Sequence, residues 1–195
     1  VLGARSDIGL AVAHRFAKEG FDVQLAARNS FDLKNDSEDL KIRYGILSSI
    51  HEIDILNINS YSEFVKSLPT HPSVVVSAIG LLGAQNESEL DIKKTIEILR
   101  TNFEGVAVML GLFANHFKDR RSGTLIGISS VAGDRGRASN YIYGSAKAGF
   151  SAFLSGLRNR LYPYGVNVIT VKPGYVRTRM TSNFDLPEKL TTDPQ

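Results

Sequence analysis

The stretch VLGARSDIG, residues Val1 to Gly9, determines the expected fold because it joins the end of a strand to the start of a helix. Gly3 allows a tight turn there, and Gly9 leaves room for a backbone or a phosphate to come close. A glycine turn between a strand and a helix is typical of a phosphate-binding loop, but glycine also occupies many turns that bind nothing. The rest of the chain has to separate these two interpretations.

Beyond this loop, short β-branched runs alternate with longer helical patterns, which predicts a parallel sheet covered by helices on both faces. Runs such as VVVS and VNVITV lack polar alternation, which indicates strands buried on both sides. We predict strands at residues 1–2, 22–26, 51–56, 73–77, 123–128 and 167–172, and helices at 8–18, 36–44, 62–67, 92–117 and 141–161. The predicted fold class is α/β, a doubly wound parallel sheet that forms one domain over residues 1–195.

The composition is that of an ordinary globular protein, with 43% apolar and 22% charged residues among 195. The 23 basic and 20 acidic residues are scattered, which argues against a nucleic-acid partner. No apolar run approaches the roughly 20 residues that span a bilayer, so no membrane span is expected. The absence of cysteine excludes disulfides, thiolate metal ligands and cysteine nucleophiles, and no other metal site is predicted. A cytoplasmic location is expected.

Two residues at strand ends are candidates for ligand binding. Arg28 closes the second predicted strand, where a doubly wound fold presents a side chain to the adenosine ribose. An acid there would favour NAD, whereas a guanidinium suits a 2′-phosphate, although a solvated surface arginine is the alternative. Gly80 lies just past the carboxyl end of the strand at 73–77, where open α/β sheets bind ligands, although a plain loop is the better interpretation of this residue without support from elsewhere.

The segment NYIYGSAKAGF, residues 140–150, carries the candidate catalytic chemistry. Residues four apart share a helix face, so Lys147 is expected beside Tyr143, while Tyr141 faces elsewhere. A nearby ammonium should lower the pKa of a tyrosine and suit it to proton transfer. Ser130, at the end of a strand, would hold a substrate oxygen as negative charge develops, although serine is also common in turns.

With these motifs in place, the chain resembles the short-chain dehydrogenase/reductase family over nearly all of its 195 residues, which implies a Rossmann fold. The resemblance implies that Asn102, Ser130, Tyr143 and Lys147 form a catalytic tetrad. It also implies that Lys147 bonds the nicotinamide ribose and holds, with Asn102, a water of a proton relay. The implied cofactor-binding residues are Gly3, Arg5, Ser6, Asp7, Ile8, Gly9, Arg28, Asp54, Ile55, Ala78, Ile79, Gly80, Tyr143, Lys147, Pro173, Gly174 and Val176.

Two departures from the family pattern concern the cofactor. Asp7 stands where the family has its middle glycine and brings an anionic side chain beside the expected pyrophosphate, unless it caps a helix that starts at Ile8. SAIG, residues 77–80, replaces the usual Asn-Asn-Ala-Gly, so Ser77 and Ala78 lack the bracing amides. SAIGLLGAQ, NYIYGSAKAGF and VKPGYVRTRMT are similar to segments of the reductase subunit of decaprenylphosphoryl-ribose 2-epimerase, which implies a keto sugar of cell-envelope biosynthesis as substrate.

The expected function is reversible hydride transfer between NADP(H), favoured over NAD(H), and a small-molecule carbonyl or secondary alcohol. The family resemblance implies a homodimer or homotetramer that pairs through the helices at 92–117 and 141–161, and a mobile substrate lid beginning with residues 176–184. The chain opens without an initiator Met, and we expect it to lack its native N-terminus and C-terminal elements. Two alternatives stay open: a non-catalytic NAD(P)-binding regulator, and a sugar-nucleotide epimerase or dehydratase.

Overall fold

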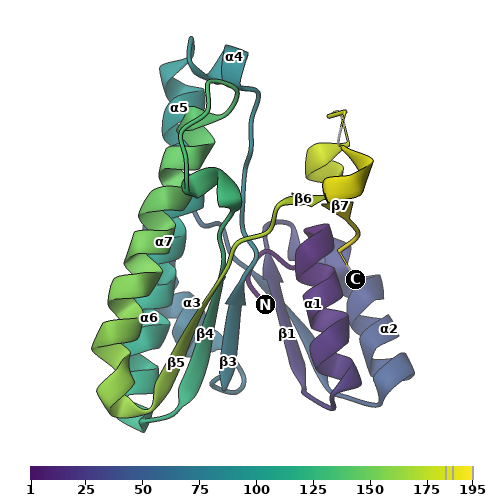
Figure 1. The fold of residues 1–195 in the computed structure, drawn as a ribbon. Helices are drawn as coiled ribbons and strands as arrows, with labels where there is room; N and C mark the ends of the chain where they lie inside the picture. The colour runs from purple at the N-terminus through teal and green to yellow at the C-terminus, as the bar shows by residue number, and fades with distance from the viewer. Residues whose placement is uncertain (183, 186, 195) are drawn as a thin grey trace. The chain divides into compact units, whose positions relative to one another are not determined.

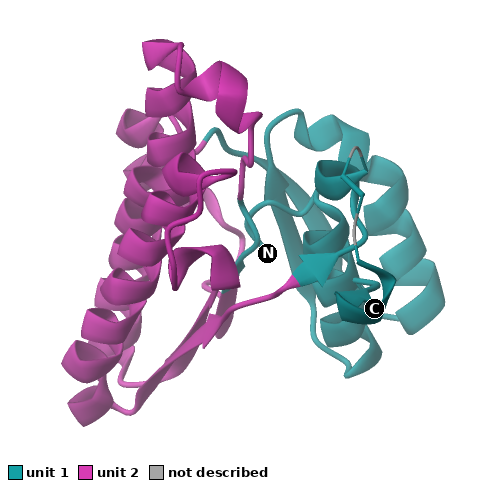
Figure 2. Ribbon diagram, turned by 45° about the horizontal axis from the view of Figure 1, so that its top comes forward, with its two compact units in different colours: residues 1–54, 76–79, 175–195 teal, residues 55–75, 80–174 magenta. Residues whose placement is uncertain are grey.

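The computed structural model of the protein describes residues 1–182, 184–185 and 187–194. The chain divides into two compact units, shown in different colours in Figure 2. The first unit comprises residues 1–54, 76–79 and 175–195, and the second comprises residues 55–75 and 80–174. The single domain expected from the sequence remains a prediction.

The helices and strands alternate along most of the chain (Figure 1). The helices are α1 (Asp7–Lys18), α2 (Lys34–Tyr44), α3 (Tyr61–Ser67), α4 (Gln85–Ser88), α5 (Ile92–Leu99), α6 (Gly105–Arg120) and α7 (Tyr141–Leu161). The strands are β1 (Val23–Ala27), β2 (Ser48–Glu52), β3 (Val74–Ser77), β4 (Gly123–Ile128), β5 (Val166–Val171), β6 (Tyr175–Val176) and β7 (Thr191–Thr192). Within the described residues, no helix has the length and apolar character needed to cross a membrane.

In the first unit, β1 and β2 pair in parallel and α1 and α2 pack against them. The strand expected at residues 1–2 is reduced to Leu2, which forms single parallel bridges with Ala26 and Ser77. Small side chains of α1 let the helix lie close to the strands. The core of this unit includes the buried residues Ala13, Ala17, Val23, Leu25, Ala27, Leu33 and Leu40.

The strand expected at residues 51–56 was placed too late, because β2 spans Ser48–Glu52. Its apolar signal came from Ile53 and Ile55, which are buried but lie beyond the end of the strand. The residues that do pair with β1 are mostly polar and half-buried. Burial and strand pairing therefore fall on different residues in this segment.

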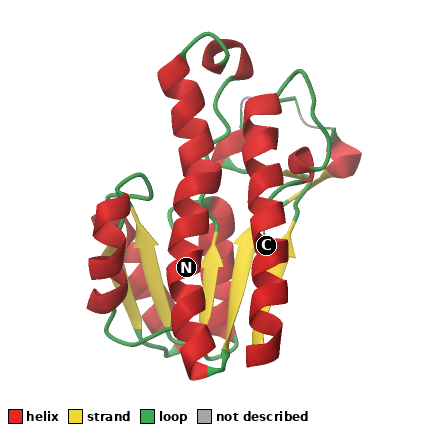
Figure 3. Cartoon of the chain, turned by 90° about the vertical axis from the view of Figure 1, so that its left-hand side faces the viewer, coloured by secondary structure: helices red, strands yellow, loops and turns green. Residues whose placement is uncertain are grey.

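In the second unit, β4 and β5 pair in parallel over six residues each, from Gly123 opposite Val166 to Ile128 opposite Val171. The strand order in this sheet is β3-β4-β5. The long helices α6 and α7 run side by side and cover the strands (Figures 1 and 3). Gly127 makes this packing close, because a Cβ there would lie 2.4 Å from the Leu154 side chain of α7.

The predicted helix at 141–161 has the same bounds as α7, whereas the predicted helix at 92–117 is interrupted. A π-helical turn, Arg100–Glu104, separates α5 from α6. Such turns are costly and recur at functional sites. Asn102, one of the predicted catalytic residues, lies inside it and is fully buried.

Candidate active site

Three predicted catalytic residues meet at the end of β4 and the start of α7. The Tyr143 hydroxyl is hydrogen-bonded to the Ser130 side chain. The Lys147 ammonium lies 5.7 Å from the centroid of the Tyr143 ring and donates to the Ile128 carbonyl at 3.1 Å. Only 2% of Lys147 is exposed. The structure therefore brings Ser130, Tyr143 and Lys147 together as the sequence predicted.

Two glycines that the sequence analysis did not single out allow this meeting. Gly133 ends the turn that follows Ser130, and a Cβ there would lie 2.7 Å from the amide nitrogen of Ala148 in α7. Gly144 is its counterpart on the helix, because its Cβ would lie 2.7 Å from the Ala132 carbonyl oxygen. The turn and the helix backbone are thus in contact, and the only sequence signal for this was a glycine on each side.

Burial dominates the electrostatics of the site. It raises the pKa of Tyr143, and the hydrogen bond with Ser130 offsets this in part. Burial also lowers the pKa of Lys147 from 10.5 to about 8. Both shifts have one cause, since a low-dielectric surrounding disfavours whichever form of a group is charged.

The expectation that the pKa of Tyr143 is lowered is therefore wrong for this structure, because burial raises it by more than the hydrogen bond with Ser130 lowers it. The ammonium lies over the tyrosine ring, and desolvation is the largest influence on the phenol. A phenol with a raised pKa stays protonated at neutral pH. The arrangement consequently suits Tyr143 to donating a proton to an oxygen that gains negative charge.

Asn102 uses its side chain to hold a neighbouring loop. Its Oδ1 accepts from the Leu81 amide at 3.1 Å, and its Nδ2 donates to the carbonyls of Leu81 at 2.7 Å and Ile98 at 2.9 Å. Leu81 follows the predicted cofactor residue Gly80. Asn102 is thus a positioning residue in this structure, and its membership of a proton relay remains a prediction.

Tyr141 and Ser129 neighbour predicted catalytic residues in the sequence, but their hydroxyls form hydrogen bonds elsewhere. Tyr141 is 47% exposed, and its hydroxyl donates to Glu89 at 3.2 Å. The Ser129 hydroxyl is 3.0 Å from the Lys147 carbonyl and 2.7 Å from the hydroxyl of Ser151, so it ties the strand end to α7. The predicted choice of Tyr143 over Tyr141 agrees with their surroundings.

In the first unit, the glycine loop forms a compact cradle. Gly3 has a φ of +79°, and a Cβ there would lie 2.9 Å from the backbones of Ala78 and Ile79. A Cβ at Gly9 would lie 2.5 Å from the Gly3 carbonyl. Ser6 caps α1 by accepting from the Gly9 amide at 3.0 Å. These five predicted residues are brought together, and the cradle is a shape that only glycine permits at positions 3 and 9.

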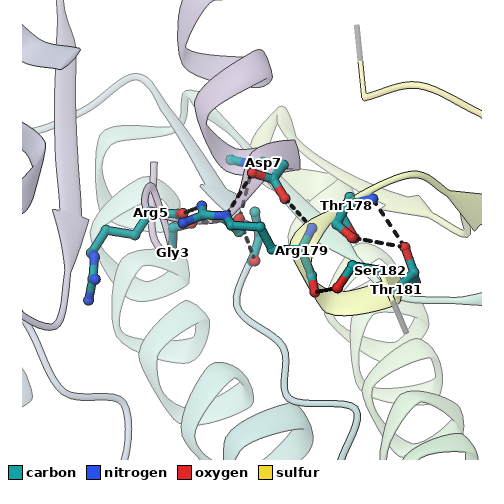
Figure 4. A network of polar contacts seen from close by, with 10 residues as sticks. Gly3, Arg5, Asp7, Thr178, Arg179, Thr181 and Ser182 are labelled. Carbon is teal, nitrogen blue, oxygen red and sulfur yellow. Dashed lines mark hydrogen bonds and ion pairs between the residues drawn. The ribbon is translucent and has the colours of Figure 1, made fainter. Parts of the chain in front are cut away.

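Asp7 is not the helix cap that the sequence allowed, because α1 begins at Asp7 and Ser6 caps it. Ile8 follows inside the helix. The Asp7 carboxylate instead contacts Arg179, a residue that the sequence analysis did not single out (Figure 4). The two residues are 172 positions apart, so no local pattern could indicate the contact.

Basic groups gather at the end of β1. Arg28 follows the strand with an exposed side chain, and its carbonyl accepts from Arg5 Nη1 at 3.1 Å. Arg5 Nη2 also forms an ion pair with Asp32 at 2.8 Å. Arg5 and Asp32 therefore balance each other, and the Glu52 carboxylate also lies at this strand end, where it accepts from the amides of Asn29 and Ser30 at 2.9 and 2.7 Å.

The other predicted cofactor residues lie at loop positions within one unit or the other. Asp54 follows the end of β2, and Ile55 is buried against the hydroxyl of Tyr61. The Pro173 carbonyl accepts from the amide of Val131 at 3.2 Å, next to Ser130. Gly174 follows Pro173 in the loop after β5.

Val176 lies in β6 and pairs with Thr192 of β7. The lid expected at residues 176–184 includes Asn183, which lies outside the described residues. Of its described part, residues 179–181 form one helical turn after β6.

Comparisons with known proteins agree on the kind of protein. A family model described as short chain dehydrogenase matches residues 1–189. An uncharacterized oxidoreductase of Mycobacterium tuberculosis is 34% identical over 198 residues, covering 100% of this chain and 79% of the relative. An uncharacterized oxidoreductase of Streptomyces coelicolor is 35% identical over 198 residues, covering 100% and 77% respectively.

Solved structures resemble the fold of the whole chain. A short-chain dehydrogenase from Sphingobium yanoikuyae in complex with NADPH has a TM-score of 0.89 at 22% identity, and the match covers 100% of this chain and 78% of that one. The predicted α/β fold class, a Rossmann fold with a parallel sheet and covering helices, is confirmed.

Proposed function

Because the chain belongs to the short-chain dehydrogenase/reductase family, we propose that it transfers hydride between NADP(H) and a carbonyl or secondary alcohol, with Tyr143 as the proton donor and acceptor. The observation that supports this proposal is the buried contact of Tyr143 with both Ser130 and Lys147. A phenol and a hydroxyl are in contact there, and an ammonium lies over the ring of the phenol. This is the set of groups needed to hold and protonate a reacting oxygen.

The first unit has the features needed to hold the cofactor. The close packing at Gly3 and Gly9 shapes the tight turn before α1, and phosphates would bind at the N-terminus of that helix, where backbone N–H groups favour anions. Arg28 would bind a 2′-phosphate with charge-assisted hydrogen bonds. When bound, the nicotinamide ring of the cofactor supplies or accepts the hydride.

The second unit would supply the acid–base chemistry. Ser130 would hold the substrate oxygen by a hydrogen bond, and Tyr143 would donate its proton to that oxygen during reduction. The Lys147 cation would stabilise the phenolate left behind. In the oxidative direction Tyr143 would take the proton back from the alcohol.

The preference for NADP(H) is a prediction that depends on Arg28. Replacing Arg28 with alanine is expected to weaken NADPH binding about tenfold and NADH binding little, because only NADPH carries the 2′-phosphate. Dissociation constants of both cofactors, measured by titration calorimetry, provide the test. Arg15→Ala removes an exposed arginine of α1 that pairs with Glu19, and it should change neither constant. Equal losses for both cofactors, or a wild type that prefers NADH, would contradict the assignment.

The substrate is proposed only as a carbonyl or secondary alcohol, and the keto sugar remains a prediction from resemblance. A screen of NADPH oxidation against keto sugars, polyprenyl-linked sugars, steroids and acyl ketones tests both the general substrate class and the keto sugar. Turnover of any of these carbonyls supports hydride transfer. A nucleotide sugar converted without net cofactor consumption would instead favour the epimerase or dehydratase alternative, and cofactor binding without any turnover would favour the regulator.

We also propose that the chain pairs with a second copy through α5, the turn after it, and α6. These segments expose large apolar side chains, namely Ile92, Ile96, Leu99, Phe103 and Val108. Val108→Glu is expected to shift the dimer or tetramer towards monomer, because it places a charge in an apolar contact. Light scattering coupled to size-exclusion chromatography measures this. Ile42→Glu, on the exposed face of α2, is the matched control, and a shift in both variants or in neither would argue against this interface.

A further inference from the structure

We propose that Arg179 is a positioning residue for cofactor binding, which cancels the charge of Asp7 at the start of α1 and fastens residues 178–182 to the glycine loop. This inference rests on the proposed function, because it concerns the phosphates that the loop would hold. It addresses the departure at Asp7, where an acid replaces the glycine of the family pattern. The Asp7 carboxylate and the Arg179 guanidinium compensate each other's charge at this place.

The contact between Asp7 and Arg179 has two points on each partner (Figure 4). The backbone N–H of Arg179 donates to Asp7 Oδ2 at 2.7 Å, and its Nε donates to Oδ1 at 3.0 Å. The Nη2 group of Arg179 also donates to the carbonyl of Arg5, on the other side of the loop. Arg179 thus bridges the start of α1 and the glycine turn with both main chain and side chain.

The turn that carries Arg179 is itself fixed by local hydrogen bonds. The Thr178 amide donates to Thr181 Oγ1 at 3.0 Å, and the Thr181 hydroxyl donates to the Val176 carbonyl at 2.6 Å. The Ser182 hydroxyl donates to the Arg179 carbonyl at 3.0 Å. These bonds orient the Arg179 amide before it meets Asp7, so little freedom remains to be lost when the ion pair forms.

Charge explains why the pair matters. A carboxylate in the first turn of α1 interacts well with the helix dipole, but it lies beside the place where an anionic pyrophosphate would bind. Asp7 is partly shielded, with 29% of its side chain exposed against 72% for Arg179. A lone Asp7 would therefore repel the phosphates through a medium that screens it incompletely. When Asp7 is paired with Arg179, the ion pair has no net charge, so it does not repel the phosphates of the cofactor.

A double-mutant cycle tests the neutralisation. Arg179→Ala is expected to weaken the binding of NADPH and NADH alike, about three- to tenfold, because Asp7 is left uncompensated. The double variant Asp7→Ala with Arg179→Ala should recover most of that loss. Arg177→Ala is the matched control, since Arg177 lies two residues away and pairs with Asp193 at 3.4 Å, and it should leave both constants unchanged.

Two outcomes of the cycle would overturn the proposal. A double variant that binds as weakly as Arg179→Ala would show that Arg179 contacts the phosphates directly, with no part for Asp7. Unchanged binding in Arg179→Ala would show that Asp7 needs no partner.

A second measurement is independent of the cofactor. Amide hydrogen exchange of the apo chain should speed up at Arg179 in Asp7→Ala, because the N–H loses its acceptor. The same amide should be unaffected in Arg177→Ala. Unchanged exchange at the Arg179 amide in Asp7→Ala would contradict the contact between Asp7 and Arg179, whatever the cofactor-binding constants are. A wild type that binds neither cofactor would instead contradict the proposed function, and the exchange result would still stand.

Discussion

Tyr143→Phe is expected to lower kcat by about a hundredfold to ten-thousandfold on any carbonyl that the wild type reduces. The ring keeps its packing against Lys147, but the transferable proton and the hydrogen bond to Ser130 are lost. NADPH binding should change little, since the loop that would hold the phosphates is untouched. Single-turnover rates and cofactor dissociation constants, measured on the same samples, separate these effects.

Tyr141→Phe is the matched control for this variant. It removes a hydroxyl only two residues away, which bonds to Glu89 on the surface. Its rate should stay close to that of the wild type. If the two variants kept similar rates on a genuine substrate, Tyr143 would not be the proton donor.

Lys147→Met is expected to remove most turnover and at the same time to stabilise the protein near neutral pH. The turnover is lost because no cation remains to stabilise the Tyr143 phenolate. The stabilisation follows from burial, which lowers the pKa of Lys147 from 10.5 to about 8. That difference corresponds to about 3 kcal/mol of destabilisation of the charged form in the folded state.

The sign of this effect gives a pH dependence. Below pH 8 the folded protein must bury an ammonium, so the full cost is present. Between pH 8 and 10.5 the unfolded chain binds more protons than the folded one, so wild-type stability gains with rising pH from this residue. The advantage of Lys147→Met should therefore shrink between pH 7 and pH 10.

Urea unfolding at the two pH values measures this advantage. Part of it, about 1 kcal/mol, should be offset by the loss of the hydrogen bond from Lys147 to the Ile128 carbonyl. Lys93→Met, at an exposed position of α5, should show no such pH-dependent change. A Lys147→Met variant that is less stable than the wild type at both pH values would mean that the ammonium is well compensated in the fold.

Local patterns predicted much of the second unit. The helix at 141–161 was found with the right bounds because its spacing is regular, and that spacing correctly placed Lys147 beside Tyr143. The same reasoning failed for the pKa of Tyr143, because burial is decided by what packs around the ring. The spacing of residues along a helix indicates which side chains can come into contact. Their exposure to solvent is determined by the packing of the whole fold.

Long-range contacts account for most of what the sequence could not predict. The helix at 92–117 is broken at Asn102, whose amide bonds to Leu81, 21 residues earlier. Asp7 was recognised as an anomaly, but its partner Arg179 lies near the other end of the chain. In both cases the sequence indicated an unusual residue and gave no means of finding what it contacts.

The hold of Asn102 on Leu81 has a consequence for the loop after β3. One amide side chain satisfies both the N–H and the carbonyl of Leu81, which is what a neighbouring strand would do for a residue in a ladder. The Asn102 side chain thus makes the two hydrogen bonds with Leu81 that the backbone of a neighbouring strand would otherwise make. The loop is ordered in advance, so a molecule that binds beside Leu81 meets a surface whose conformational entropy has already been lost in folding.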